Sequence, residues 1–205
     1  SCAFSMDYNK AFLFDLDGVL VDACDWHYEA LNKALRSVTG YEISREDHDS
    51  TYNGLPTRVK LSELADKGLI LESQIDQVCN LKQHNTQEVI YKKCEFDRSK
   101  VDLMKHLKEE GYMLGCVTNS IEKTAKFMLN RVGIQRYMDC IVSNQDVKNP
   151  KPHPEGYIKA MVMLNSLPEN TTIVEDSPKG IQAANATGAR VIVVENATQV
   201  MKEMI

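Results

Sequence analysis

Two carboxylates, Asp15 and Asp17, stand one residue apart at the end of an apolar run within residues 12–20, Phe-Leu-Phe-Asp-Leu-Asp-Gly-Val-Leu. Alternate residues of a strand face the same side, so both acids are expected on one side of the backbone. Gly18 allows the chain to turn sharply after them. Neighbouring carboxylates repel each other unless a cation lies between them. The pair could therefore hold Mg²⁺ while one carboxylate attacks and the other moves a proton; a plain acidic turn is the alternative.

Polar side chains follow a second apolar segment, where Thr118, Asn119 and Ser120 stand at the start of an expected helix. The N–H groups of a helix start and the Thr118 hydroxyl make a site for an anion. Simple helix capping is the alternative explanation for these residues.

Lys151 and an acidic pair follow the next two apolar segments. Pro150 and Pro152 flank Lys151 and restrict the backbone there, which favours a lysine aimed at a fixed target over an ordinary solvated one. Glu175 and Asp176 end the later segment. Ligands of open parallel sheets bind at the carboxyl ends of strands, so these groups are expected to meet Asp15. Their joint occurrence favours catalysis over chance.

The elements that must position these groups alternate in type. Four helical patterns alternate with the later apolar segments, and three glycines, Gly111, Gly133 and Gly188, follow them where a helix would end. This alternation predicts an α/β fold with a Rossmann-like parallel sheet. The expected strands are Ala11–Asp17, Tyr112–Asn119, Cys140–Asn144, Thr171–Asp176 and Ala189–Glu195.

The stretch from residue 21 to residue 95 contains helical patterns and no convincing strand. One amphipathic helix stops near Gly40, a second runs from Pro56 to about Gly68, and a third starts at Ser73 with Asp76 as its capping-box partner. We therefore expect a core domain of residues 9–20 and 96–205, and an inserted helical cap domain of residues 21–95. The insertion leaves the core beside the acidic strand end, where it can cover that site.

Composition narrows the class of protein. The chain has 205 residues, 43% of them hydrophobic, and a net charge of -5, which suits a globular domain and argues against nucleic-acid binding. The six cysteines form no Cys-x-x-Cys pair, so we expect reduced thiols, no zinc and a cytoplasmic protein. We see no membrane span or signal-peptide pattern and expect a monomer. Ser1 replaces an initiating Met, and residues 1–8 carry no argument.

Four motifs resemble the haloacid dehalogenase (HAD) superfamily, in its β-phosphoglucomutase-like branch with a helical cap. They are FDLDG (14–18), VTNS (117–120), KPHPE (151–155) and EDSPKG (175–180), in the order of the family and with the helical insertion between the first two. The resemblance covers residues 10–196. It implies a HAD-like fold and a phosphoryl-transfer enzyme that uses Mg²⁺ as a cofactor.

The resemblance also implies roles for individual residues. Asp15 would be the nucleophile that forms an aspartyl-phosphate, and Asp17 the acid and base. Thr118 and Asn119 would hold the phosphoryl group, with Lys151 neutralising its charge. Mg²⁺ would be bound by Asp15, the main-chain carbonyl of Asp17, Asp176 and, directly or through water, Glu175. An acid at position 17 argues against dehalogenation, because a halide leaves without a proton.

Hydrolysis and sugar phosphomutation remain open from the sequence. The segment Asn53–Arg58 departs from the glycine–valine–serine–arginine segment of the mutases, and Thr118–Ser120 is closer to the phosphatases. His27, Arg58 and Lys82 are candidate substrate contacts from the cap, with a solvated or buried structural role as the alternative. We therefore predict a Mg²⁺-dependent phosphatase of a small phosphorylated metabolite, such as a sugar phosphate. A phosphomutase is the first alternative, and a non-catalytic phospho-accepting or binding module is the second.

Overall fold

The computed structural model describes residues 7–204, so Ser1 and Cys2 lie outside the described residues. Five parallel strands form one sheet in the order β3-β2-β1-β4-β5. Their bounds are Ala11–Phe14 for β1, Met113–Val117 for β2, Cys140–Val142 for β3, Thr171–Glu175 for β4 and Arg190–Val193 for β5. The predicted α/β class and parallel sheet are confirmed. The expected strands were too long at their carboxyl ends, because the polar residues there leave the ladder of backbone hydrogen bonds.

Helices cover both faces of the sheet. They are α5 (Arg98–Glu109), α6 (Glu122–Val132), α7 (Glu155–Met163) and α8 (Pro178–Asn185). Phe12 and Phe14 of β1 pack in one hydrophobic cluster with residues of α5 and α6. Ala11 and Leu13 pack on the other face in a cluster with α7 and α8. A strand buried on both faces reads as a continuous apolar run, which explains the sequence pattern of β1.

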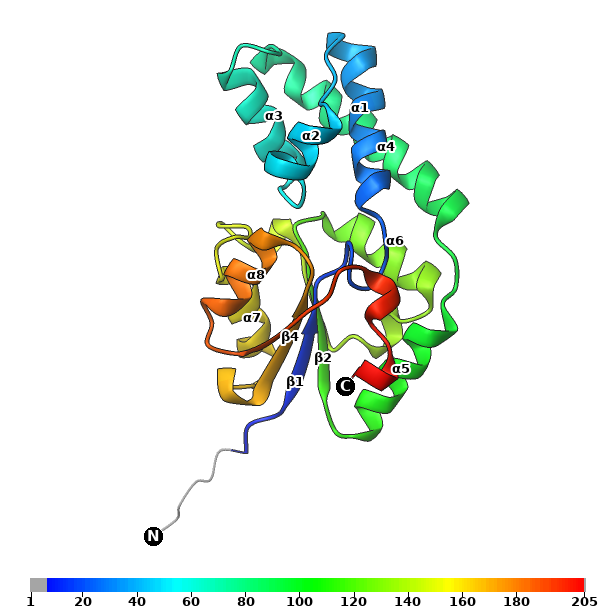
Figure 1. Cartoon of the computed structure of the whole chain (residues 1–205), viewed down its shortest axis with the longest axis vertical. Coiled ribbons are helices and arrows are strands. Elements are labelled where there is room, and N and C mark those ends of the chain that lie inside the picture. Colours follow the sequence, from blue (N-terminus) through cyan, green and yellow to red (C-terminus); the bar gives the residue numbers. More distant parts are fainter. Residues whose placement is uncertain (1–6, 205) are drawn as a thin grey trace.

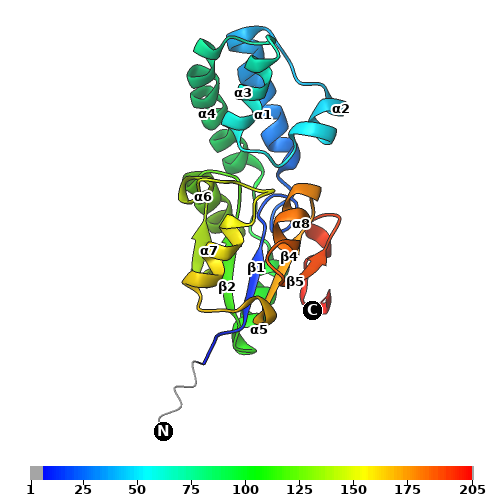
Figure 2. The same cartoon turned by 90° about the vertical axis from the view of Figure 1, so that its left-hand side faces the viewer.

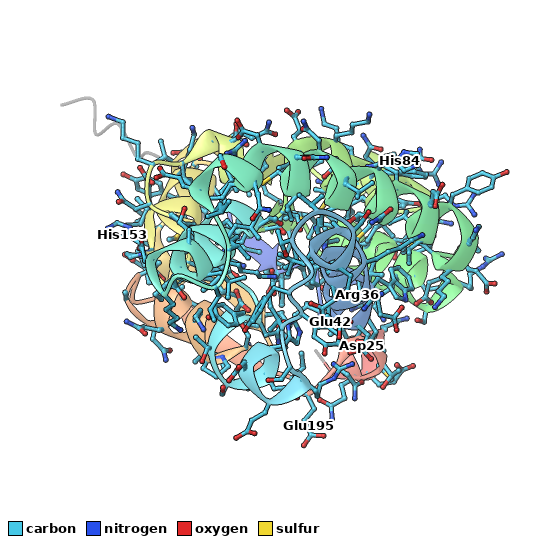
Figure 3. All side chains as sticks on the ribbon, turned by 90° about the horizontal axis from the view of Figure 1, so that it is seen from above. Asp25, Arg36, Glu42, His84, His153 and Glu195 are labelled. Atoms are coloured by element: carbon cyan, nitrogen blue, oxygen red, sulfur yellow. The ribbon has the colours of Figure 1, made fainter. Side chains whose placement is uncertain are left out.

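Among the described residues, only helical elements and turns lie between β1 and β2. Besides α5, which packs on the sheet, the helices are α1 (Cys24–Thr39), α2 (Arg45–Asp47), α3 (Thr57–Asp66) and α4 (Ile75–Lys93). These four helices form a separate group. They gather beyond one end of the sheet, at the top of Figure 1, and the view in Figure 2 shows the same separation. A hydrophobic cluster of their own, which includes Leu35, Leu61 and Val78, holds them together. Seen from above, the polar side chains of His84, His153 and Glu195 lie around the outer rim (Figure 3).

The helix-end glycines behave as their positions predict. Gly40 ends α1 with φ 76° and Gly133 ends α6 with φ 97°, the left-handed region in which glycine is favoured. The predicted capping box of Ser73 and Asp76 is wrong. The chain enters α4 through a 3₁₀ turn, Glu72–Gln74, and the N–H of Leu71 donates to the Gln74 side chain at 3.0 Å.

The structure also describes five of the cysteines and the apolar character of the helices. Cys116 and Cys140 are buried in the sheet, and the five cysteines within the described residues are free thiols. Within residues 7–204, none of the helices has both the length and the apolar character needed to cross a membrane.

Candidate active site

Lys151 connects the carboxyl ends of three neighbouring strands. Its ammonium donates to the main-chain oxygen of Val117 at 2.7 Å, to Asp15 Oδ1 at 2.8 Å and to Glu175 Oε1 at 2.8 Å. These residues end β2, follow β1 and end β4, respectively. An ammonium has three N–H donors, so every one of them is used.

Burial distinguishes Lys151 from an ordinary surface lysine, because only 7% of it is exposed. Burial alone would lower the pKa of Lys151, but the charges of Asp15 and Glu175 outweigh it and raise that pKa. The Tyr157 hydroxyl also donates to Glu175 Oε1. Sequence reasoning missed Tyr157; its signal is a tyrosine in the first turn of the helix that directly follows the Lys151 loop.

Three carboxylates meet beside Lys151. Asp15, Glu175 and Asp176 each offer an oxygen, and these atoms lie within 4.8 Å of one another. Burial first, and then the charge of Glu175, raise the pKa of Asp15 well above its usual value. Burial likewise raises the pKa of Asp176 to about 6. Three carboxylates and one ammonium leave two negative charges, the balance that a divalent cation would neutralise.

The surroundings of this acidic cluster fit a metal ion with oxygen ligands. Asp176 Oδ1 is buried and has no hydrogen-bond partner among the described residues, so it has an acceptor position to offer. Gly18 has φ 88°, and a Cβ atom there would lie 2.0 Å from Asp176 Oδ2. Glycine is therefore required at this position to leave room for the carboxylate. Carboxylate oxygens are the ligands that Mg²⁺ prefers.

Asp17 faces away from this cluster and toward helices α1 and α4, where it meets His27. Its Oδ1 lies 2.9 Å from His27 Nε2, and its Oδ2 accepts a hydrogen bond from the Ser120 hydroxyl at 3.1 Å. His27 Nδ1 in turn lies 2.9 Å from Lys82 Nζ. A charged lysine only donates, so Nδ1 accepts and Nε2 carries the proton that is donated to Asp17. Sequence reasoning predicted His27 and Lys82 near the site and placed Ser120 in the polar group at the start of the helix, but it missed the contact of Ser120 with Asp17.

Asp17, His27 and Lys82 contact one another in that order, and their pKa shifts have different causes. Burial would raise the pKa of Asp17, but the charge of His27 and the hydrogen bonds from His27 and Ser120 lower it. Burial, followed by the charge of Lys82, lowers the pKa of His27. Burial lowers the pKa of Lys82 to about 7. Lys82 is only 7% exposed, so the alternative of a solvated lysine is wrong.

Thr118 and Asn119 have protein partners in this structure. The Thr118 hydroxyl is buried and accepts from the Ser120 N–H at 3.0 Å. Asn119 Oδ1 accepts from the Lys151 N–H at 3.1 Å, and Asn119 Nδ2 donates to the Gly54 carbonyl at 2.7 Å. Asn119 therefore joins the Lys151 loop to the helical segment between β1 and α5, and the phosphate contacts expected of Thr118 and Asn119 stay predictions.

A cavity of about 540 Å³ lies between the strand ends and the helical segment. Its wall includes Asp15, Lys151 and Asp176 from the strand side, and the predicted residues His27, Arg58 and Lys82 from the helical segment. Arg58 is exposed at the rim and pairs with Asp76 at 2.8 Å. The wall also includes Lys60 of α3, a buried residue that sequence reasoning missed. Its signal is a lysine on the helical face that carries Leu61 and Leu64.

The sheet order, the helical insertion and the lysine-bridged carboxylates define an α/β enzyme equipped for phosphoryl transfer. The family described as "Haloacid dehalogenase-like hydrolase" matches residues 12–194. The chain belongs to this family and, as predicted, is a phosphatase-type hydrolase.

Relatives and solved structures agree with this assignment. The chain is 29% identical over 182 residues to the "Phosphorylated carbohydrates phosphatase" of Thermotoga maritima, covering 87% of this chain and 82% of the relative. It is 28% identical over 181 residues to the "Pyrophosphatase PpaX" of Anoxybacillus flavithermus, covering 88% and 81%. The solved β-phosphoglucomutase of Clostridium difficile is similar in structure, with a TM-score of 0.82 and 26% identity over 95% of this chain and 94% of that one.

Proposed function

We propose that the protein is a Mg²⁺-dependent phosphatase that hydrolyses a small phosphorylated metabolite through an aspartyl-phosphate on Asp15. The observation that carries the proposal is the position of Lys151 Nζ, 2.8 Å from both Asp15 Oδ1 and Glu175 Oε1. An ammonium at that position holds a carboxylate ready and offers positive charge where a phosphoryl group would arrive.

The proposed reaction has two displacements at phosphorus. In the first, a carboxylate oxygen of Asp15 forms a bond to phosphorus, the ester P–O bond breaks, and Asp17 donates a proton to the leaving oxygen. In the second, Asp17 takes a proton from water, the water oxygen bonds to phosphorus, and the bond to Asp15 breaks. Each step is easier than direct attack of water on the ester.

Charge on the phosphoryl oxygens would be met by Lys151, by Thr118 and Asn119, and by the start of α6. Asp15, Asp176, the main-chain carbonyl of Asp17 and Glu175, directly or through water, would hold Mg²⁺. The bound ion would neutralise the carboxylates and the developing charge. The missing partner of Asp176 Oδ1 among the described residues supports this ligand set.

The substrate would lie in the cavity under residues 21–95, which we propose as the cap domain on the core of residues 9–20 and 96–205. A volume of about 540 Å³ suits a small metabolite rather than a polymer. The similarity to a phosphorylated carbohydrates phosphatase supports a sugar phosphate within this class, and the similarity to a pyrophosphatase adds pyrophosphate to the compounds to be tested.

The test measures phosphate release from p-nitrophenyl phosphate, sugar phosphates and pyrophosphate, with Mg²⁺ and with excess chelator. We expect release that needs Mg²⁺, and a loss of at least about a thousandfold in kcat for Asp15→Asn. Asp66→Asn, which changes an exposed carboxylate, is the matched control and should keep full activity. Equal turnover by the Asp15 variant and the unchanged protein would remove Asp15 from its proposed role.

A sugar phosphomutase is the second candidate, favoured by the structural similarity to β-phosphoglucomutase and by Arg58 at the rim of the cavity. Assaying each sugar phosphate for isomerised product as well as free phosphate separates the two. Isomer formation that depends on an added sugar bisphosphate would select the mutase, whereas free phosphate without isomer selects the phosphatase. Absence of both products, with phosphate retained on the protein, would select a phospho-accepting module.

A further inference from the structure

Lys60 is a buried lysine whose charge has no partner among residues 7–204. It lies on the inner face of α3, is 4% exposed and forms part of the cavity wall. None of the described side chains forms a hydrogen bond or ion pair with its ammonium. Lys82, in contrast, contacts His27 at 2.9 Å, and Lys179 donates to the Thr51 carbonyl at 3.0 Å.

The charges around Lys60 do not compensate it. Burial is the first cause that lowers its pKa to about 8, and the charge of Lys179 acts in the same direction. Asp17 is the carboxylate that acts against this lowering, but its oxygens are already engaged by His27 and Ser120. Lys60 also lowers the pKa of Lys82, so two buried lysines repel each other on this wall.

The Lys60 side chain is buried, but its ammonium keeps access to the cavity, because it does not belong to the fully buried polar atoms that lack a partner within residues 7–204. A largely buried charge is costly, and such groups are normally paired or hydrogen-bonded. The cost is removed if an acceptor with negative charge arrives from the cavity. A neutral hydroxyl could accept a hydrogen bond but would leave the charge uncompensated. Lys60 comes from the cap side of the cavity, opposite the strand ends that carry Asp15 and Lys151.

We propose that Lys60 binds a second anionic group of the substrate, so that the substrate class is a small phosphate ester or anhydride that also carries a carboxylate or a further phosphate. The inference rests on the proposed function, because it takes the first phosphoryl group to lie at the strand ends. Lys60 acts here as a specificity-determining residue and takes no part in bond breaking.

The experiment uses two inert ligands that differ in one charge. Phosphonoacetate carries a phosphonate and a carboxylate, whereas ethylphosphonate has a methyl group in place of the carboxylate. Each is titrated calorimetrically, in Mg²⁺, into the unchanged protein, Lys60→Met and Lys33→Met. Lys33 is an exposed lysine of α1, so its replacement controls for the loss of one positive charge. Methylenediphosphonate, in which a P–C–P bridge replaces the cleavable P–O–P bond of pyrophosphate, is used as a competing ligand and distinguishes a second phosphate from a carboxylate.

We expect the unchanged protein and Lys33→Met to bind phosphonoacetate at least about tenfold more tightly than ethylphosphonate, as one charge-assisted hydrogen bond allows. In Lys60→Met that ratio should fall below about threefold, with an unchanged thermal melting curve or a more stable one. A ratio kept by Lys60→Met, or absent from the unchanged protein, would overturn the proposal. Because the ligands are not hydrolysed, a failed phosphatase assay would leave this result standing.

Discussion

The two walls of the cavity contain buried lysines in opposite states. On the strand side, Lys151 is surrounded by Asp15, Glu175 and the Val117 carbonyl, all within 2.8 Å. On the opposite wall, Lys60 is slightly more buried than Lys151 but has no such acceptor among the described residues. A buried charge that the protein itself compensates, as at Lys151, is part of a site that is already formed before the substrate binds. A charge that the protein leaves uncompensated indicates what the ligand has to supply.

The largest effect expected from this contrast is on the strand side. Lys151→Met would leave Asp15 and Glu175 buried without their cation. Removing one partner of a buried ion pair costs about 3–5 kcal/mol, so the free energy of unfolding should fall by that amount. Urea unfolding followed by circular dichroism measures the loss, and phosphate release should disappear with it.

Lys92→Met is the matched control, because Lys92 is an exposed residue of α4. Its free energy of unfolding should change by less than about 0.5 kcal/mol. A Lys151 variant as stable as this control would show that the carboxylates on the strand side do not depend on the lysine.

Replacing Lys60, on the opposite wall, with Met should change the free energy of unfolding in the opposite direction. Lys60→Met removes a charge whose pKa is lowered from 10.5 to about 8 in the folded protein. A lowered lysine pKa means that the unfolded chain holds the proton more tightly, which opposes folding below pH 8. The variant should therefore be more stable than the unchanged protein by roughly 1–3 kcal/mol at pH 7.

This gain should depend on pH in a defined direction. Between about pH 8 and pH 10.5, folded Lys60 loses its proton before the unfolded chain does, so the stability of the unchanged protein rises relative to the variant. Urea unfolding at pH 7 and pH 9.5 should show the difference shrinking at the higher pH. A difference that is constant across this range would mean that Lys60 is compensated in the folded state.

The smallest effect is expected where the two walls meet. Ser120→Ala removes the hydrogen bond to Asp17 Oδ2, which helps to lower the pKa of Asp17. Loss of one such bond is worth about 1 kcal/mol. Because Asp17 must be protonated to donate to the leaving oxygen in the proposed first step, the basic limb of the kcat/KM profile should move to higher pH. Ser62→Ala, at an exposed position of α3, should leave the profile in place. A Ser120 variant with the same profile would contradict the expected effect on Asp17.

The sheet could be predicted from sequence because the central strands β1 and β2, which are buried along almost their whole length, have continuous apolar runs. The partly exposed edge strand β5 was found from its β-branched residues. All five expected segments contain a strand of the structure. The convergence of Asp15, Lys151 and Asp176 in one cavity could also be anticipated, because the carboxyl ends of parallel strands lie at one edge of the sheet. The chemical roles of these residues and the division into core and cap remain predictions.

The elements that were missed lack a periodic signal. Residues 45–52 form α2 and a π-helical turn, yet their polar composition gives no amphipathic pattern. Lys60 was missed because a lysine in a helix is ordinarily solvated, and its burial depends on how α3 packs over the cavity. The start of α4 was misassigned because Ser73, Gln74 and Asp76 all have capping side chains, and only the geometry selects Gln74.

The saturation of Lys151 has a consequence for how a reaction could begin. A phosphoryl oxygen that approaches this ammonium finds no vacant N–H, so one existing acceptor must be exchanged for it. The Val117 carbonyl is fixed in the sheet, and Glu175 is also held by Tyr157, which leaves Asp15 as the partner that can let go. On the proposed mechanism, this exchange frees an oxygen lone pair of Asp15. Binding of the phosphoryl group and activation of the Asp15 nucleophile then occur in the same step.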